Sequence, residues 1–423
     1  MSAHAPSWYA ASANSFPSLP SLDGDRNVDV CIIGAGMTGC AAALDLAERG
    51  YKVLVLEAER VGWGASGRSG GQFIHDYACG NQTLQRLVGK TQARQHWQLS
   101  IEALVLLRKR VADHGIDCDL RDGFCAAAIK PRQQRALEQE QEFLQQTYDY
   151  PTELWTGERL REQVNSPRYI AGLFDARSGH LHPLNYTLGL ASAARKAGAD
   201  IVEQTRALSL QHGSKVQIRT DRGTVTADFV VLAANAYLGK LAPQLDRKIM
   251  PVGTYIMATE PLGPERAESL IRNDICVCDT NFVLDYFRRS ADHRLLFGGR
   301  VSYSKLEPRN LTERLCRHML RVFPQLHDIQ PAYTWGGYVD ITMNRAPHFG
   351  RLQPNVFFAQ GFSGHGVALT GMAGRLIADA ISGQAERFDM FARIPHHNFP
   401  GGTMFRTPAL VLAMAWYRLR DLL

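Results

Sequence analysis

The clearest pattern of apolar and polar positions lies near the N-terminus and changes its period within thirty residues. Residues 28–33, VDVCII, form an apolar and β-branched run that is typical of a buried parallel strand. Residues 38–49 are rich in Ala, Leu and Glu, and Gly50 stands where a helix is expected to end. The following sequence, KVLVL, predicts a second buried strand. This order predicts a strand–helix–strand unit with parallel strands.

The pattern further along the chain predicts a second region of a different kind. Residues 82–148 have the spacing of long amphipathic helices. The stretch beginning LNYTLGLASAARK predicts another helix with strands after it, and ADFVVLAANAY predicts a buried strand. Residues 245–335 alternate apolar and polar positions with many aromatics, which predicts an antiparallel sheet covered on one face.

Composition indicates an ordinary globular protein of more than one domain. The 423 residues are 45% hydrophobic and 21% charged, with a formal net charge of +6. The arginines are scattered and form no block of the nucleic-acid-binding type, so we expect no nucleic-acid partner. The N-terminal 25 residues lack the pattern of a secretory signal, and no stretch reaches the ~20 apolar residues of a spanning helix. These features predict a cytoplasmic protein.

The cysteines and histidines do not form an evident metal site. Cys276 and Cys278 have the spacing of one face of a strand, with no second pair nearby. His180 and His182, in GHLHP, lie in a loop before a predicted helix. We therefore expect no metal, and the eight cysteines form no disulfide framework.

The first strand is followed by a motif that carries chemistry. Gly34, Gly36 and Gly39 form G-x-G-x-x-G directly after the strand. Gly34 permits a tight turn, Gly36 lets the backbone approach a pyrophosphate, and Gly39 lets the helix pack on the strand. Glu57 ends the second strand, where its carboxylate can accept hydrogen bonds from a ribose diol. The arrangement predicts a dinucleotide site but does not by itself distinguish NAD from FAD.

Two further glycine-rich segments bear on that choice. RVGWGASGRSGGQ, residues 60–72, has five glycines, which predicts a loop that passes close to a bulky planar ligand. QGFSGHGVALTGMAG, residues 360–374, also has five, followed by a helical pattern.

With these motifs, the chain resembles the FAD-dependent D-amino-acid-oxidase-like superfamily and, within it, the bacterial γ-glutamylputrescine oxidase group. The resemblance rests on the first strand–helix–strand unit with its glycine loop, on GGYVDITMNRAPHFG and on GFSGHGVALTGMAGRLIADAISG. SWYAASAN near the start and FPGGTMFRTPALVLAMAWYRLRDLL at the end also match. The resemblance therefore covers nearly the whole chain.

The resemblance implies an α/β fold in which a Rossmann-like, glutathione-reductase-like FAD domain is interrupted by an antiparallel-sheet substrate domain. We expect an N-terminal arm over residues 1–27 and a tail with an apolar, basic helix over residues 391–423. The FAD domain is expected at residues 28–75, 161–240 and 336–390, and the substrate domain at 76–160 and 241–335.

The resemblance also implies non-covalent FAD, since nothing matches a flavin-linked His or Cys. In the superfamily the C-terminal glycine-rich segment wraps the flavin ring, and its helix points its N-terminus at the ring's carbonyl edge. Residues 361–368 match that segment. The expected FAD contacts are Gly34, Ala35, Gly36, Thr38, Gly39, Glu57, Ala58, Arg60, Ala65, Ser66, Gly67, Arg68, Gly70, Gly71, Gln72, Ala207, Asn235, Gly361, Phe362, Ser363, Gly364, Gly366, Val367 and Ala368.

The activity implied is oxidation of an amine to an imine, with dioxygen or a quinone as electron acceptor. Two residues are candidates for a catalytic role. Arg300 lies where sarcosine-oxidase relatives carry a lysine that promotes reaction with dioxygen, although a salt-bridged surface role is an equal alternative. His365 either faces the flavin or faces a neighbouring loop.

One departure from the sarcosine-oxidase pattern bears on the substrate. The lysine that grips a substrate carboxylate in those relatives is replaced here by Val367-Ala368. A longer amine, such as γ-glutamylputrescine or a related polyamine conjugate, therefore fits better than a small amino acid. Its aromatic channel is expected to use Tyr255, Tyr286, Trp335 and Tyr338, each of which could instead be core.

Two other interpretations remain at this stage. One is a membrane-associated dehydrogenase for D-amino or imino acids that passes electrons to quinone, and the other is a flavin-binding subunit without turnover. The apolar helix after Thr407-Pro408 either lies on the inner face of the membrane or docks into protein.

Overall fold

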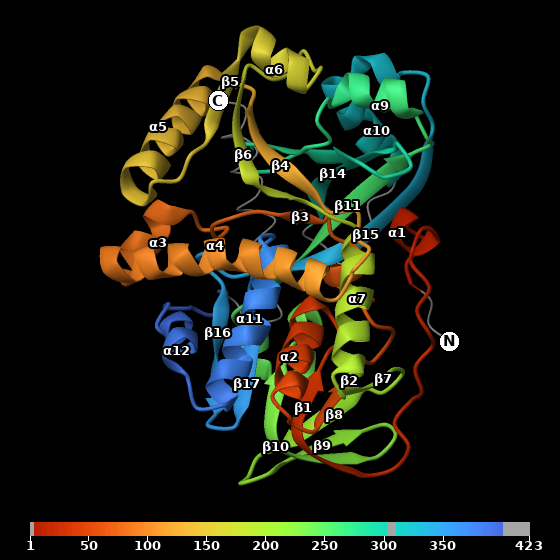
Figure 1. Ribbon diagram of the computed structural model, residues 1–423, viewed down its shortest axis with the longest axis vertical. Helices are drawn as coiled ribbons and strands as arrows, with labels where there is room; N and C mark the ends of the chain where they lie inside the picture. The colour runs from red at the N-terminus through yellow and green to blue at the C-terminus, as the bar shows by residue number, and fades with distance from the viewer. Residues whose placement is uncertain (1–3, 303–309, 401–423) are drawn as a thin grey trace.

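One of the two sheets of the protein is built around strand β1 (Arg26–Ile33), in the lower half of Figure 1. The computed structural model describes residues 4–302 and 310–400. β1 pairs in parallel with β2 (Val53–Leu56) on one side and with β10 (Thr224–Leu232) on the other, as its apolar sequence predicts. The strand order is β16-β17-β10-β1-β2-β7, with β8 and β9 added beside β10. The remaining strands are β7 (Asp200–Val202), β8 (Ala207–Gln211), β9 (Val216–Thr220), β16 (His348–Gln353) and β17 (Val356–Gln360).

Three helices lie side by side on one face of this sheet, as Figure 1 shows: α7 (Pro183–Lys196), α2 (Met37–Glu48) and α11 (Gly366–Ile381). Glycines allow this close approach. A Cβ on Gly39 would lie 1.9 Å from the Gly34 carbonyl oxygen, and a Cβ on Gly374 would lie 2.6 Å from the backbone nitrogen of Ala42. The long helix α4 (Lys90–Asp113) crosses the upper end of α11, and α3 (Asn81–Val88) precedes it.

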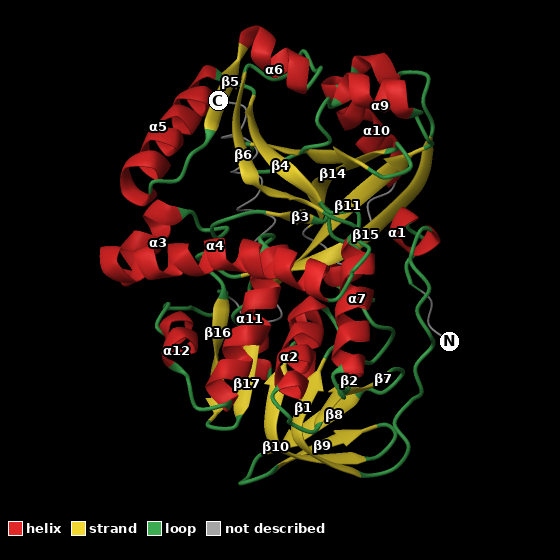
Figure 2. Ribbon diagram, in the orientation of Figure 1, coloured by secondary structure: helices red, strands yellow, loops and turns green. Residues whose placement is uncertain are grey.

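The second sheet forms the upper half of the molecule in Figures 1 and 2. Its strand order is β15-β11-β14-β13-β12-β4-β6-β3, with β5 paired to β6. Its neighbours are antiparallel except β4 and β12, which are parallel. The strands are β3 (Gln72–Phe73), β4 (Arg121–Ala128), β5 (Glu153–Thr156), β6 (Ala171–His180), β11 (Met250–Thr259), β12 (Cys276–Asp279), β13 (Tyr286–Arg289), β14 (Leu295–Ser302) and β15 (Pro331–Ile341).

Helices cover the outer side of this second sheet. Its core includes the buried rings of Phe287, Phe297 and Phe323. The outer helices are α5 (Pro131–Tyr148), α6 (Gly157–Gln163), α9 (Pro264–Leu270) and α10 (Leu311–Val322). Two short helices lie elsewhere, α8 (Pro243–Asp246) before β11 and α12 (Glu386–Ala392) near β16.

The chain crosses between the two sheets at points that differ from those expected. β3 and β6 belong to the second sheet, although both fall in ranges assigned to the FAD domain. β15 also continues to Ile341, beyond the expected boundary at residue 335. The reason is pairing across the chain: β6 takes β4 as its neighbour over seven residue pairs, a contact that the local pattern of residues 171–180 does not reveal.

The N-terminal arm, residues 4–25, has its helix near the level where the two halves meet and then runs down the side of the lower half in Figure 1. Its helix α1 (Trp8–Ala11) lies against α7 and the second sheet. His182 caps α7 by accepting a hydrogen bond from the Asn185 backbone at 3.1 Å, and His180 contacts the Asp274 carbonyl at 2.6 Å. In the described residues, no helix is long and apolar enough to cross a bilayer. The expected tail helix after Thr407-Pro408 lies outside the described residues.

Candidate cofactor and active site

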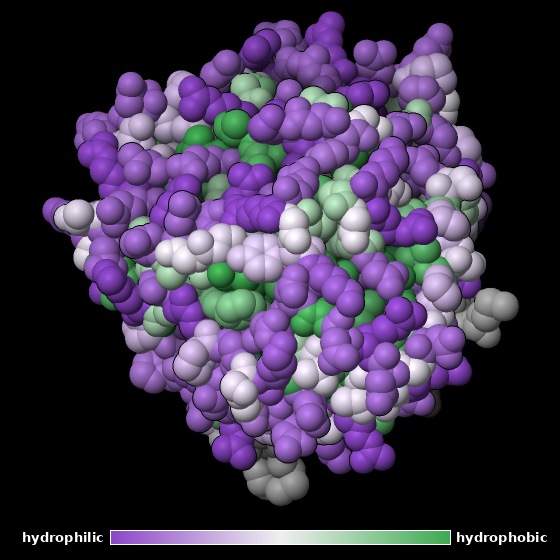
Figure 3. Space-filling view, turned by 60° about the horizontal axis from the view of Figure 1, so that its bottom comes forward, coloured by the Kyte–Doolittle hydropathy of each residue, from purple (hydrophilic) through white to green (hydrophobic). Residues whose placement is uncertain are grey.

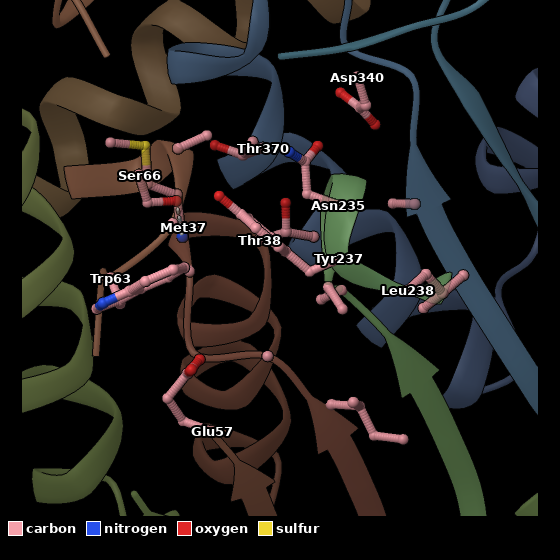
Figure 4. Close-up of a pocket in the computed structure, with 18 of the residues that line it drawn as sticks. Met37, Thr38, Glu57, Trp63, Ser66, Asn235, Tyr237, Leu238, Asp340 and Thr370 are labelled. Carbon is pink, nitrogen blue, oxygen red and sulfur yellow. Dashed lines mark hydrogen bonds between the residues drawn. The ribbon is translucent and has the colours of Figure 1, made fainter. Parts of the chain in front are cut away.

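A single cavity collects residues from the glycine-rich segments that the sequence singles out. It encloses about 1310 Å³ of space free of protein atoms, part of it open to solvent. Its walls come from the β1–α2 turn, the loop after β2, the ends of β10 and β15, and the start of α11. Figure 4 shows these segments converging on the cavity, with Glu57 and Asp340 on opposite sides.

Two helix N-termini face this cavity. Gly36, Met37 and Thr38 at the start of α2 line it, as do Gly366 and Val367 at the start of α11. Neither N-cap residue closes its helix with a side-chain hydrogen bond. The positive end of each helix dipole therefore faces the cavity, with first-turn N–H groups that the N-cap side chains do not occupy, and negative charge is stabilised there.

The phosphate turn itself is tightly built. The Ser66 hydroxyl oxygen accepts a hydrogen bond from the Met37 backbone at 2.9 Å. A Cβ on Gly36 would lie 2.8 Å from that same oxygen, and Gly34 has a φ of +107° beside the carbonyl of Ala233. A side chain at position 36 would therefore crowd Ser66 in the wall of the cavity, whereas glycine lets the backbone approach a pyrophosphate.

Glu57 is fixed by the backbone around it. Its carboxylate accepts hydrogen bonds from the backbone N–H groups of Ala35 and Glu59, both at 2.8 Å. Burial raises the pKa of the carboxyl, while those two hydrogen bonds oppose the shift. The acid lies on the cavity wall at the end of β2, where a ribose diol can reach it.

Asp340 is a buried acid on the opposite wall. It accepts a hydrogen bond from the Gly361 backbone, and its own carbonyl accepts one from Ser363 at 3.0 Å. With its amide nitrogen turned toward this carboxylate, Asn235 lies 2.7 Å from it. Burial raises the pKa of Asp340 to about 7. Asp340 thereby ties the end of β15 to the segment that precedes α11.

The structure brings a large share of the expected cofactor residues to this cavity. Those that line it are Gly34, Gly36, Thr38, Glu57, Ala58, Ala65, Ser66, Ala207, Asn235, Phe362, Gly364, Gly366 and Val367. The others are not part of its lining: Ala35, Gly39, Arg60, Gly67, Arg68, Gly70, Gly71, Gln72, Gly361, Ser363 and Ala368. Arg60, for example, pairs with Glu203 at 3.4 Å, and Gln72 donates to the carbonyl of Val277.

The two candidate catalytic residues are placed differently. The His365 ring lies close to the Asp76 backbone in the loop after β3, and burial lowers its pKa to about 3. Arg300 lies on β14 at a β-bulge, since Thr254 pairs with Val301 and Tyr255 with Gly299. The Arg300 side chain lies outside the described part of the structure.

The four candidate substrate aromatics lie in the second sheet, behind or beside the cavity wall. Tyr255 is buried in that sheet's core, and Trp335 donates from its indole nitrogen to the Arg68 carbonyl at 3.0 Å. Tyr286 packs over Gly70 and Gly298. Tyr338 meets Tyr237 edge to face, with ring centroids 6.2 Å apart.

Sequence reasoning missed several wall residues. Trp63, Tyr237 and Asp340 line the cavity, and the rings of Trp63 and Tyr237 contact each other at 5.6 Å. Trp63 stands inside the glycine-rich segment 60–72, and this was a signal available in the sequence. Tyr237 follows β10 and Asp340 lies on β15, and these strands are placed by pairing with distant segments, β10 with β1 and β15 with β11.

These features define a dinucleotide site between a sheet with parallel central strands and a second sheet. Comparison with known proteins agrees. The model of the FAD dependent oxidoreductase family (DAO) matches residues 29–380, so the chain belongs to this family.

Relatives match over their whole length. γ-Glutamylputrescine oxidoreductase of Escherichia coli K12 is 42% identical over 100% of this chain and 99% of its own. A probable oxidoreductase, OrdL, of Haemophilus influenzae is 41% identical over 99% and 97%. Among solved structures, glycine oxidase from Geobacillus kaustophilus has a TM-score of 0.75 and 21% identity, covering 88% of this chain and 99% of its own. The protein is thus an FAD-dependent oxidoreductase.

The residues present fit FAD. The turn at Gly36 and the α2 N-terminus suit the pyrophosphate, Glu57 suits the adenosine ribose, and the α11 N-terminus suits an electron-rich ring edge. When bound, FAD accepts the two electrons of the oxidation.

Proposed function

We propose that the protein oxidises a primary amine at the end of a long chain, with γ-glutamylputrescine or a related glutamyl-polyamine as substrate. The observation that carries the proposal is the 42% identity to a γ-glutamylputrescine oxidoreductase over 100% of the chain. Because the similarity extends over the whole chain, it is not limited to a shared cofactor-binding domain.

The chemistry of the cavity supports the same substrate class. Val367 lines the cavity at the α11 N-terminus, so an apolar side chain stands where a carboxylate clamp would be needed for a small amino acid. Burying a carboxylate there without a cation would cost several kcal/mol. An amine whose acidic end lies far from the reacting carbon avoids that cost.

The proposal assigns tasks in this reaction to residues of the wall. The rings of Trp63, Tyr237 and Phe362 line the cavity and, in this proposal, help to exclude water from it while the amine is oxidised. The carbon loses a hydride and the amine a proton, giving an imine. Water then hydrolyses the imine to an aldehyde and ammonia.

We propose dioxygen as the electron acceptor, reduced to hydrogen peroxide. We also propose that Arg300 and His365 take part in this reaction, together with the other site residues named above. If dioxygen reacts near Arg300, the positive charge of this residue would stabilise the negative charge that develops on dioxygen.

The experiment compares kcat/KM for γ-glutamylputrescine, putrescine, spermidine, sarcosine and D-alanine. Peroxide formation and reduction of a quinone analogue are measured separately. We expect γ-glutamylputrescine to exceed sarcosine and D-alanine by at least tenfold, about 1.4 kcal/mol in transition-state binding. A tenfold preference for sarcosine or D-alanine would overturn the substrate assignment, and quinone reduction without peroxide would overturn the acceptor. Failure of every amine to bleach the flavin under anaerobic conditions would favour a subunit without turnover.

A further inference from the structure

Arg288, on β13, is a buried cation that the proposed reaction does not use. Only 3% of its surface is exposed, and its guanidinium donates hydrogen bonds to neutral groups, while the carboxylates of Asp119 and Asp274 interact with it electrostatically. One of the neutral groups is His180, whose pKa is held well below its usual value by burial and by the Arg288 charge. Because a buried guanidinium is costly, its retention calls for a function.

Arg288 joins the N-terminal arm to the glycine-rich loop of residues 60–72. Its Nε donates to the Gly70 carbonyl at 2.8 Å, and its Nη2 donates to the Tyr9 hydroxyl at 3.1 Å. Nη2 also donates to the Leu181 carbonyl at 3.0 Å, and the Leu181 backbone N–H donates in turn to Gly71 at 2.9 Å. The guanidinium therefore fixes the arm and the end of the loop to one rigid group.

A second connection runs through Trp335. The Tyr9 ring meets the Trp335 ring edge to face, with centroids 5.1 Å apart. The Trp335 indole donates to the Arg68 carbonyl, while Arg68 donates to the Trp63 carbonyl at 2.7 Å and lies 4.2 Å from the centre of the Trp63 ring. Trp63 is itself part of the cavity wall.

Tyr9 is thus the point at which both connections meet the arm. It is fully buried, and α1 is anchored beside it by the Trp8 indole, which donates to Asp292 at 3.2 Å. We propose that the N-terminal arm is a working part of the FAD site: Tyr9, acting through Arg288 and Trp335, holds the loop of residues 60–72 in the conformation that binds the cofactor. Tyr9 and Arg288 are positioning residues, since neither lines the cavity.

The test measures FAD affinity of the apoprotein by quenching of flavin fluorescence. Tyr9→Phe removes the hydroxyl and should raise the Kd about threefold, whereas Tyr9→Leu also removes the contact with Trp335 and should raise it at least tenfold, about 1.4 kcal/mol. Arg288→Lys keeps the charge but cannot reach all of its partners, and should also raise the Kd at least tenfold. The matched control is Tyr51→Phe, whose hydroxyl contacts the Ile381 carbonyl at 3.5 Å, and its Kd should stay within twofold.

Thermal unfolding midpoints of the apo and FAD-bound forms distinguish this role in FAD binding from a purely structural role. The proposal predicts that the gap between the two midpoints narrows in Tyr9→Leu. Equal losses in both forms with an unchanged Kd would overturn it. Should Arg288→Lys fail to fold, Tyr9→Phe decides, because it changes one hydroxyl only. The inference requires FAD but no particular amine, so a different substrate would leave it intact.

Discussion

Asp45 and Arg110 form an ion pair inside the helical layer, with 2% and 3% of their side chains exposed. Arg375 approaches the same carboxylate at 2.7 Å, so that Asp45 connects α2 to both α4 and α11. Asp45→Asn would leave a buried guanidinium without its counter-charge. We expect the free energy of unfolding to fall by about 3–5 kcal/mol, measured by urea denaturation.

The control for this prediction is Asp113→Asn. Asp113 pairs with Lys109 one helical turn away, and both side chains are exposed. Loss of such a pair costs about 0.3–0.5 kcal/mol. Equal effects of the two substitutions would show that burial of the Asp45 pair has no energetic consequence.

Substitution of Gly36 should act on FAD in a graded way. A Cβ there meets the Ser66 hydroxyl at 2.8 Å, and a small shift of that side chain could accommodate Ala. Val adds branches where the pyrophosphate must approach. We expect Gly36→Ala to weaken FAD binding and Gly36→Val to abolish it, as measured by the flavin content of purified protein. Wild-type affinity in Gly36→Val would mean that the phosphate turn has been misplaced.

FAD should be bound non-covalently. The described residues that line the cavity include no Cys or His, and Cys316 lies on α10 with its sulfur 3.4 Å from that of Met257. Acid precipitation should therefore leave the yellow colour in the supernatant. Colour that stays with the pellet after washing would contradict the prediction.

Asp340 should make stability depend on pH. Burial raises its pKa from 3.8 to about 7 in the folded protein. Between these values the folded protein holds a proton that the unfolded chain has released. Its contribution to stability is therefore fully present below about pH 4 and is lost as the pH rises to about 7. We expect Asp340→Asn to gain stability relative to the wild type over that interval.

Thermal unfolding of the apoproteins between pH 4 and 8 measures this difference. Asp113→Asn, at an exposed site, serves as the control and should follow the wild-type curve. A constant offset between Asp340→Asn and the wild type across the whole interval would refute the raised pKa.

The parts of the fold that the sequence predicts well are those with local causes. β1, α2 and β2 follow from apolar runs, and the G-x-G-x-x-G turn is enforced by contacts between near neighbours such as Gly34 and Gly39. FAD and the family also follow from the motifs and from their order along the chain.

The rest depends on pairing between distant segments. β6 joins the second sheet because β4 is there to receive it, and Asp340 reaches the cavity because β15 runs past residue 335. The arm carries no chemical motif, so nothing in its sequence reveals that Tyr9 contacts Arg288, 279 residues later. Such contacts arise only from the assembled fold.

The order of strands in the first sheet has a consequence for synthesis of the protein. β1 and β2 emerge early, but their sheet also needs β10 and then β17 (Val356–Gln360), which pairs with β10. α11, whose N-terminus faces the cavity, is made later still. The cofactor pocket therefore cannot close until most of the chain has left the ribosome, and capture of FAD is a late step in the maturation of the nascent protein.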